Sequence, residues 1–97
     1  MIDRGEFTRK ARSVALKVLG DYEKGRVFNS IEVACQIQAR AVVSHHVMKL
    51  KEKGGKPYAD PILECFIQGY ASAASQLVHS YISFDLTQQA VLEEPTS

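Results

Sequence analysis

Three histidines and two cysteines are the side chains in this sequence best suited to metal binding or catalysis: His45, His46, His79, Cys35 and Cys65. Neighbouring residues of a helix point to different faces, so His45 and His46 rarely bind one ion together from a single helix. Each cysteine lies in an apolar segment, as is typical of a buried and reduced thiol. From these spacings we expect neither a metal site nor a bound cofactor.

Arrangements that would support catalysis are missing as well. The segment Gly54-Gly55-Lys56-Pro57 lacks the spacing and the hydroxyl residue of a phosphate-binding loop. No serine–histidine–aspartate or cysteine–histidine order stands out, and no pair of carboxylates precedes a candidate pocket. A chain of 97 residues suits one compact domain with a modest core. We therefore expect residues 1–97 to form a single, non-enzymatic domain.

Charge is distributed unevenly along the chain. All twelve lysines and arginines precede Pro57, whereas six of the eleven carboxylates precede it and five follow. Residues 1–56 therefore carry a net charge of about +6 and residues 57–97 about −5, although the whole chain has only +1. Unless a short chain has segregated its charges by chance, this pattern predicts one basic surface for an anionic partner.

The sequence shows no segment expected to enter or cross a membrane. Residues 1–4 are not followed by the apolar core of a signal peptide. The longest apolar stretch, residues 62–84, contains Glu64, Gln68, His79 and further polar residues, which makes it too polar to span a bilayer. We expect a cytoplasmic protein without a membrane partner.

Glycine and proline divide the chain into three helical segments, so the expected fold is all-α. The first two, at about residues 3–24 and 30–53, begin with the capping-box pairs Asp3–Glu6 and Asn29–Glu32 and end at Gly25 and Gly54. The third begins at Asp60-Pro61. Beyond it, Asp85 and Gln88 predict a short C-terminal helix, followed by a tail at residues 93–97. The loop at residues 54–58 has room for at most a minimal β-wing.

The apolar residues of the second segment fall on two arcs, roughly half a turn apart on a wheel of 3.6 residues per turn. Either the segment is one helix buried on two sides, or it contains two helices with a bend between them. One arc comprises Ala34, Ile37, Ala41, Val42 and Met48, and the other comprises Val33, Val43, Val47 and Leu50.

Residues 43–54 resemble the recognition helix of bacterial winged helix-turn-helix repressors, in particular the arsenic-sensing and multiple-antibiotic-resistance families. Those families commonly read V-S-x-H-L-x-x-L-x-x-x-G, and this chain reads VSHHVMKLKEKG. Residues 31–37 look like the supporting helix, and residues 15–28 are similar to the helix and connector before it. The resemblance covers about residues 14–56. It departs from the family at residues 38–41, where the turn has no glycine and is one residue short.

The resemblance implies a bent unit whose second helix starts near Ala39 and enters the major groove of duplex DNA. The metal-sensing members carry paired cysteines on the supporting helix, where this chain has only Cys35. The residues expected to contact bases are Gln38, Arg40, Ser44 and His45. The residues expected to contact phosphates are Arg9, Arg12, Arg26, Lys49, Lys51, Lys53 and Lys56.

The third segment is expected to form an interface because it is almost uncharged. Glu64 is the only charged residue between Pro61 and Phe84, and small residues there allow a second helix to approach closely. The alternative is that this helix is the centre of a monomeric bundle. The residues expected to face a partner are Phe66, Gly69, Tyr70, Ala73, Ala74 and Leu77.

Two functions fit these patterns. The first is a small sequence-specific DNA-binding regulator acting as a homodimer, with a basic helix-turn-helix half at residues 1–56 and an acidic dimerisation half at residues 57–92. The second is a small helical modulator, such as a phage- or plasmid-type inhibitor, that binds a large host protein at an acidic or nucleic-acid-binding surface. A structural subunit of a helical complex is a third class, for which the sequence has no specific mark.

Overall fold

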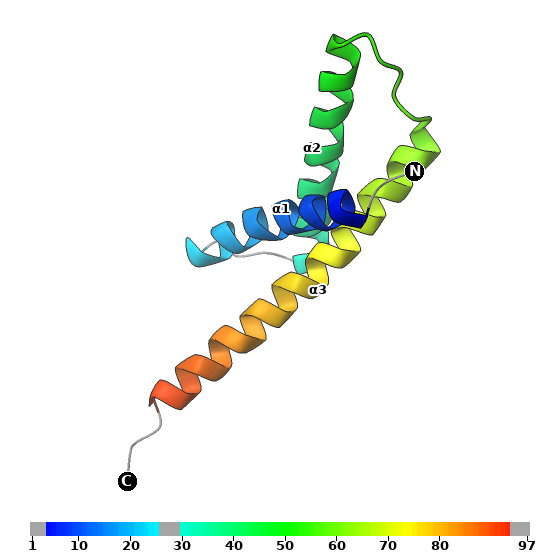
Figure 1. The fold of residues 1–97 in the computed structure, drawn as a ribbon. Coiled ribbons are helices and arrows are strands. Elements are labelled where there is room, and N and C mark those ends of the chain that lie inside the picture. The colour runs from blue at the N-terminus through cyan, green and yellow to red at the C-terminus, as the bar shows by residue number, and fades with distance from the viewer. Residues whose placement is uncertain (1–3, 26–29, 94–97) are drawn as a thin grey trace.

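The computed structural model describes residues 4–25 and 30–93, which form three α-helices and their connections (Figure 1). Helix α1 runs Arg4–Glu23, α2 runs Ile31–Glu52 and α3 runs Asp60–Glu93. No strand occurs within these two ranges, so the all-α fold expected from the sequence is confirmed and the minimal β-wing at residues 54–58 is not formed. An apolar strand would be needed there, and the segment is instead rich in glycine, lysine and proline.

Helix α2 is unbroken over 22 residues, so the bend near Ala39 and the helix-turn-helix unit that depends on it are not formed. Residues 38–41 are glutamine, alanine, arginine and alanine, which all favour a helix interior, and they include neither glycine nor proline. Nothing in the local sequence therefore stops the helix before Gly54. The continuous helix was the correct alternative.

Capping groups fix both ends of α2. The Ser30 hydroxyl accepts a hydrogen bond from the Val33 backbone N–H at 3.4 Å, so the cap is Ser30 and not its neighbour Asn29, which lies outside the described residues. At the other end Gly54 has a φ of 79°, the left-handed conformation that glycine adopts without strain. Gly25 has the same φ after α1, and both glycine stops are confirmed. Asp3, the expected cap of α1, also lies outside the described residues.

Helix α3 continues for 34 residues, so the separate C-terminal helix expected at Asp85 is wrong. Aspartate can cap a new helix, but it does not end the previous one, and the sequence has no glycine or proline between Gly69 and Pro95. The C-terminal part of α3 consequently extends past the other two helices as an arm (Figure 1). The molecule measures 65 × 26 × 21 Å.

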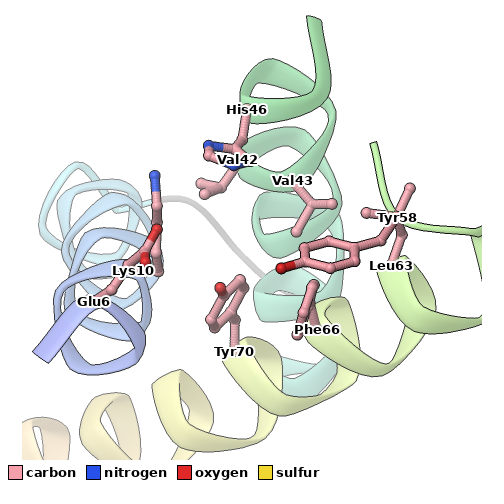
Figure 2. Close-up of a pocket in the computed structure, with 9 residues that line it drawn as sticks. All are labelled: Glu6, Lys10, Val42, Val43, His46, Tyr58, Leu63, Phe66 and Tyr70. Atoms are coloured by element: carbon pink, nitrogen blue, oxygen red, sulfur yellow. The ribbon is translucent and has the colours of Figure 1, made fainter. Parts of the chain in front are cut away.

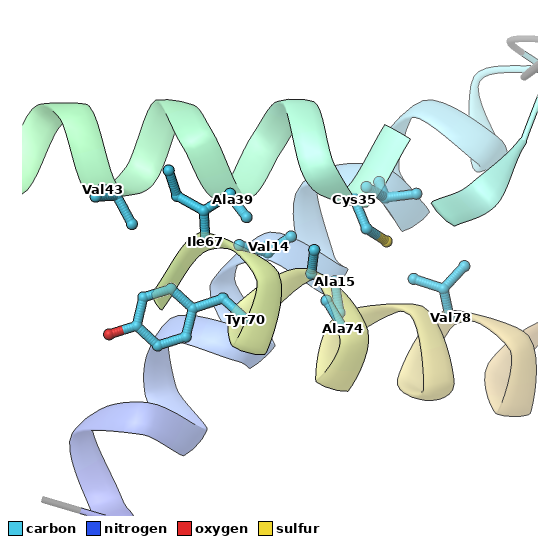
Figure 3. Packing of buried hydrophobic residues seen from close by; sticks show 11 residues of the cluster. Val14, Ala15, Cys35, Ala39, Val43, Ile67, Tyr70, Ala74 and Val78 are labelled. Atoms are coloured by element: carbon cyan, nitrogen blue, oxygen red, sulfur yellow. The ribbon is translucent and has the colours of Figure 1, made fainter. Parts of the chain in front are cut away.

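The three helices share one core, and each packs against both of the others (Figure 3). Helix α2 contributes Cys35, Ala39 and Val43, which lie four residues apart and form a single stripe. The opposite side of α2 is exposed, so the helix is not buried on two sides. The buried cluster comprises Val14, Ala15, Val18, Cys35, Ala39, Val43, Ile67, Tyr70, Ala71, Ala74 and Val78.

Candidate functional site

The four residues expected to contact bases do not form one reading surface. Arg40 is held by α3, because its Nη1 and Nη2 donate to Glu64 Oε2 and Oε1 at 3.0 and 2.7 Å. The Glu64 carboxylate raises the pKa of Arg40, and the guanidinium lowers the pKa of Glu64. Gln38 is half-buried and lies about 200° around the straight helix from Arg40. Only Ser44 and His45 are exposed without such a constraint.

The lysines expected to contact phosphates are exposed and gather where α2 ends. Lys49 and Lys53 line a shallow groove together with His45, His46 and Lys10 of α1 (hereafter the basic groove). Lys10, which the sequence analysis did not select, is half-buried and lines this groove from α1. Outside the groove, Arg9, Arg12, Lys51 and Lys56 are exposed, and Arg26 lies outside the described residues.

The basic groove opens into a more enclosed pocket, since Lys10 and His46 line both (Figure 2). This aromatic pocket has a volume of about 130 Å³ and receives side chains from all three helices and from the connection before α3. Buried Val43 and Tyr70 lie at its inner wall, and exposed His46 and Tyr58 lie at its mouth. The lining residues are Glu6, Lys10, Val42, Val43, His46, Tyr58, Leu63, Phe66 and Tyr70.

Four aromatic rings form a continuous row along this pocket. The ring centroids of Phe7 and Tyr70 are 5.3 Å apart, those of Phe66 and Tyr70 6.3 Å, and those of Tyr58 and Phe66 5.4 Å in an edge-to-face contact. Contacts of this geometry attract, so the row holds Tyr58 of the connection against α3. Burial, and secondarily the charge of Glu6, raises the pKa of Tyr70 and keeps it a neutral phenol.

A second polar cluster joins the start of α2 to the middle of α3. Glu32 Oε1 lies 2.8 Å from His79 Nε2 and accepts a hydrogen bond from the Ser75 hydroxyl at 3.4 Å, while Oε2 accepts one from Ser30 at 2.9 Å. The contact with His79, followed by hydrogen bonds from the Glu32 backbone N–H and from Ser30, lowers the pKa of Glu32 to about 2. Ser75 donates to the Glu32 carboxylate and not to the His79 imidazole, so the cluster lacks the contact between nucleophile and base of a catalytic triad.

Most residues expected at a partner interface serve the chain's own packing. Tyr70 and Ala74 are buried in the core, and a Cβ added at Gly69 would lie 3.3 Å from Phe7 Cε2, so α1 occupies the space beside this glycine. Phe66 and Ala73 are half-buried, and Phe66 lines the aromatic pocket. The expectation for Tyr70, Ala74 and Gly69 is therefore corrected: small residues there admit α1 and α2 of the same chain. Only Leu77 remains exposed, at 44%.

No group of three or more histidine, cysteine or acidic side chains in residues 4–25 and 30–93 is placed to hold a metal ion. Cys35 is buried as expected, which raises the pKa of its thiol, whereas Cys65 is exposed on α3 and the expectation of a buried thiol is wrong there. None of the helices, over the part of the chain that the structure describes, is long and apolar enough to cross a membrane.

Comparison of the chain with family models, curated proteins and solved structures finds no match. The site must therefore be interpreted from its own geometry. Sequence reasoning selected Lys49 and Lys53 but missed the aromatic pocket. Phe66 and Tyr70, four residues apart, were a signal for one shared face of a helix, but they were assigned to a dimer. The contribution of Lys10 and Tyr58 depends on how distant segments pack.

Proposed function

We propose that this chain is a small, non-enzymatic helical module that binds an acidic surface of a larger protein. The observation that carries the proposal is the junction of the basic groove with the aromatic pocket, which residues of all three helices build. Concave sites with apolar walls and a few converging polar groups are the usual form of a binding site. The surrounding positive charge favours an anionic partner and accelerates encounter with it.

The exposed side of α2 supports a protein partner. Val33, Ile37 and Met48 are 49%, 63% and 61% exposed, and with Ala41 and Ser44 they follow helical spacing on the side away from the core. An exposed apolar row on a helix is typical of helix–protein recognition. The phosphate backbone of a nucleic acid offers such a row little to bury. The kind of partner that fits is a large protein with an acidic surface, as for an inhibitor of phage or plasmid type.

A regulator that binds duplex DNA is the second candidate, favoured by the exposed lysines at residues 49, 51, 53 and 56. Without a bent unit, such a protein would depend on phosphate contacts more than on base contacts. The homodimer that accompanies this function would use a different part of α3 from the one expected. Leu77, Tyr81 and Phe84 lie on one exposed face at helical spacing and are the proposed contact.

Binding of a glutamate-rich peptide and of a DNA duplex, measured by fluorescence anisotropy at about 50 and 200 mM salt, tests both candidates. The protein-binding proposal predicts that the peptide binds and that Lys49→Gln with Lys53→Gln weakens binding. The matched control is Lys17→Gln with Lys24→Gln, which removes the same charge from exposed positions elsewhere on the molecule. Tighter binding of the duplex, with a log–log salt slope near −5 for about six phosphate contacts, would favour the DNA regulator. Binding of neither probe would refute both.

A further inference from the structure

We infer that the aromatic pocket receives one large apolar side chain from the partner, and that carboxylates on one side of that residue lie along the basic groove. This inference rests on the proposed function and adds the chemistry of the segment that is recognised. The pocket has its walls at Val42, Val43, Leu63, Phe66 and Tyr70, and the groove continues from it along α2.

The size and the walls of the pocket select the anchor. A cavity of about 150 Å³ lined by aliphatic and aromatic side chains holds one benzene molecule, so a volume of about 130 Å³ suits a phenylalanine or leucine side chain. Such a side chain gains from burial against Val43 and Leu63. A nucleobase would lose hydrogen bonds to water along these apolar walls, and its polar edges would have to be met by the polar groups of the pocket. The polar groups of the pocket are the tyrosine hydroxyls and the side chains of Glu6, Lys10 and His46.

The charges around the pocket give the bound segment a direction. Lys10 lies where the pocket joins the groove, and Lys49 and Lys53 continue the groove for about 10 Å along α2 beyond His46. In an extended partner segment, carboxylates within about three residues of the anchor span this distance of about 10 Å and can lie beside Lys49 and Lys53. Glu6 lines only the pocket and would repel a carboxylate there. The recognised segment is therefore acidic on the groove side of its anchor and uncharged on the other.

Peptides that differ at one feature test this inference. The reference peptide carries one phenylalanine followed by a run of glutamates, and the comparison peptides replace the phenylalanine with alanine, or the glutamates with glutamines. Burial of a phenylalanine side chain predicts about tenfold to a hundredfold tighter binding of the reference peptide than of the alanine peptide. Replacing the glutamates should also weaken binding and remove its salt dependence.

Variants of the protein locate the contact. Val42→Phe places a ring into the pocket and should abolish the advantage of phenylalanine over alanine in the peptide. The matched control Val33→Phe makes the same change on the exposed side of α2 and should preserve that advantage. Tyr58→Ala, in the exposed connection, removes one of the rings at the mouth of the pocket and is a second test if Val42→Phe unfolds. Circular dichroism confirms that each variant remains folded.

The outcomes separate this inference from the function on which it rests. Equal binding of the phenylalanine and alanine peptides would overturn the pocket inference and leave the acidic-partner proposal standing. Absence of binding to any acidic peptide would refute the proposed function, and the inference with it. If oligothymidine bound better than the reference peptide and Val42→Phe abolished that binding, the pocket would be a nucleobase site and the inference would be wrong.

Discussion

A proline at Ala41 tests the continuity of α2, the feature that most changes the interpretation of this chain. Ala41 is exposed in the middle of the helix, so a substitution there alters the backbone without disturbing the core. Proline removes the hydrogen bond from residue 41 to the carbonyl of residue 37, and its ring clashes with that carbonyl. The expected loss is about 3 kcal/mol in the free energy of unfolding, against a total of roughly 5–15 kcal/mol for a domain of this kind.

Glycine at the same position provides the graded comparison. Ala41→Gly should cost about 1 kcal/mol in a helix interior, because the flexible backbone loses more entropy on folding. In a helix-turn-helix unit the same substitution would leave the free energy of unfolding unchanged or raise it, because a turn at residues 38–41 accommodates glycine readily. Urea unfolding followed by circular dichroism measures both variants. If Ala41→Gly were neutral or stabilising and Ala41→Pro cost less than about 1 kcal/mol, the continuous helix would be refuted in favour of the bent unit.

Three further predictions follow from the packing. The pKa of Glu32 in the folded protein is about 2, below its ordinary value, so the unfolded chain binds a proton at this carboxylate first as the pH falls. The protein should therefore lose stability between about pH 4.5 and 2. Urea titrations across that range should show that Glu32→Gln lacks this loss. Arg40→Ala and Glu64→Ala should show a small coupling in a double-mutant cycle that shrinks at high salt, because both side chains are about half exposed. Ala74→Leu, at a fully buried site, should lower the free energy of unfolding by about 1–3 kcal/mol, whereas Leu77→Ala should change thermal unfolding little; similar effects would contradict the assignment of Ala74 to the core.

The helices themselves were predictable because their ends depend on neighbouring residues. Glycine in the left-handed conformation ends both α1 and α2, and Asp60-Pro61 opens α3. The bend and the separate C-terminal helix failed for a common reason. In both places a family likeness or a capping pair suggested a start, but the sequence contains no residue that ends the preceding helix.

Which face of α2 is buried could not be predicted from the sequence and became clear only from the packed structure. Helix α2 buries Cys35 and Ala39 and leaves the longer Ile37 and Met48 in solvent, because small side chains let α1 and α3 approach closely. A hydrophobicity pattern favours the larger residues and so indicates the wrong side. The same limit applies to the site: Lys49 and Lys53 lie on one helix at readable spacing, but the approach of Lys10 depends on the crossing of two helices.

Lysines gather at one end of the molecule and the other end has none, and this difference predicts how binding divides into two kinetic steps. The lysines at the end of α2 and the C-terminal arm of α3, which has no basic residue, lie at opposite ends of the elongated molecule (Figure 1). An anionic partner is therefore drawn to the basic end before any apolar contact forms. In rapid-mixing experiments with the phenylalanine-containing acidic peptide, Lys49→Gln should mainly lower the association rate, and more so at low salt. Val42→Phe should mainly raise the dissociation rate, because it removes a contact made only after docking. If Lys49→Gln changed only the dissociation rate, the field of the basic end would have no part in recognition.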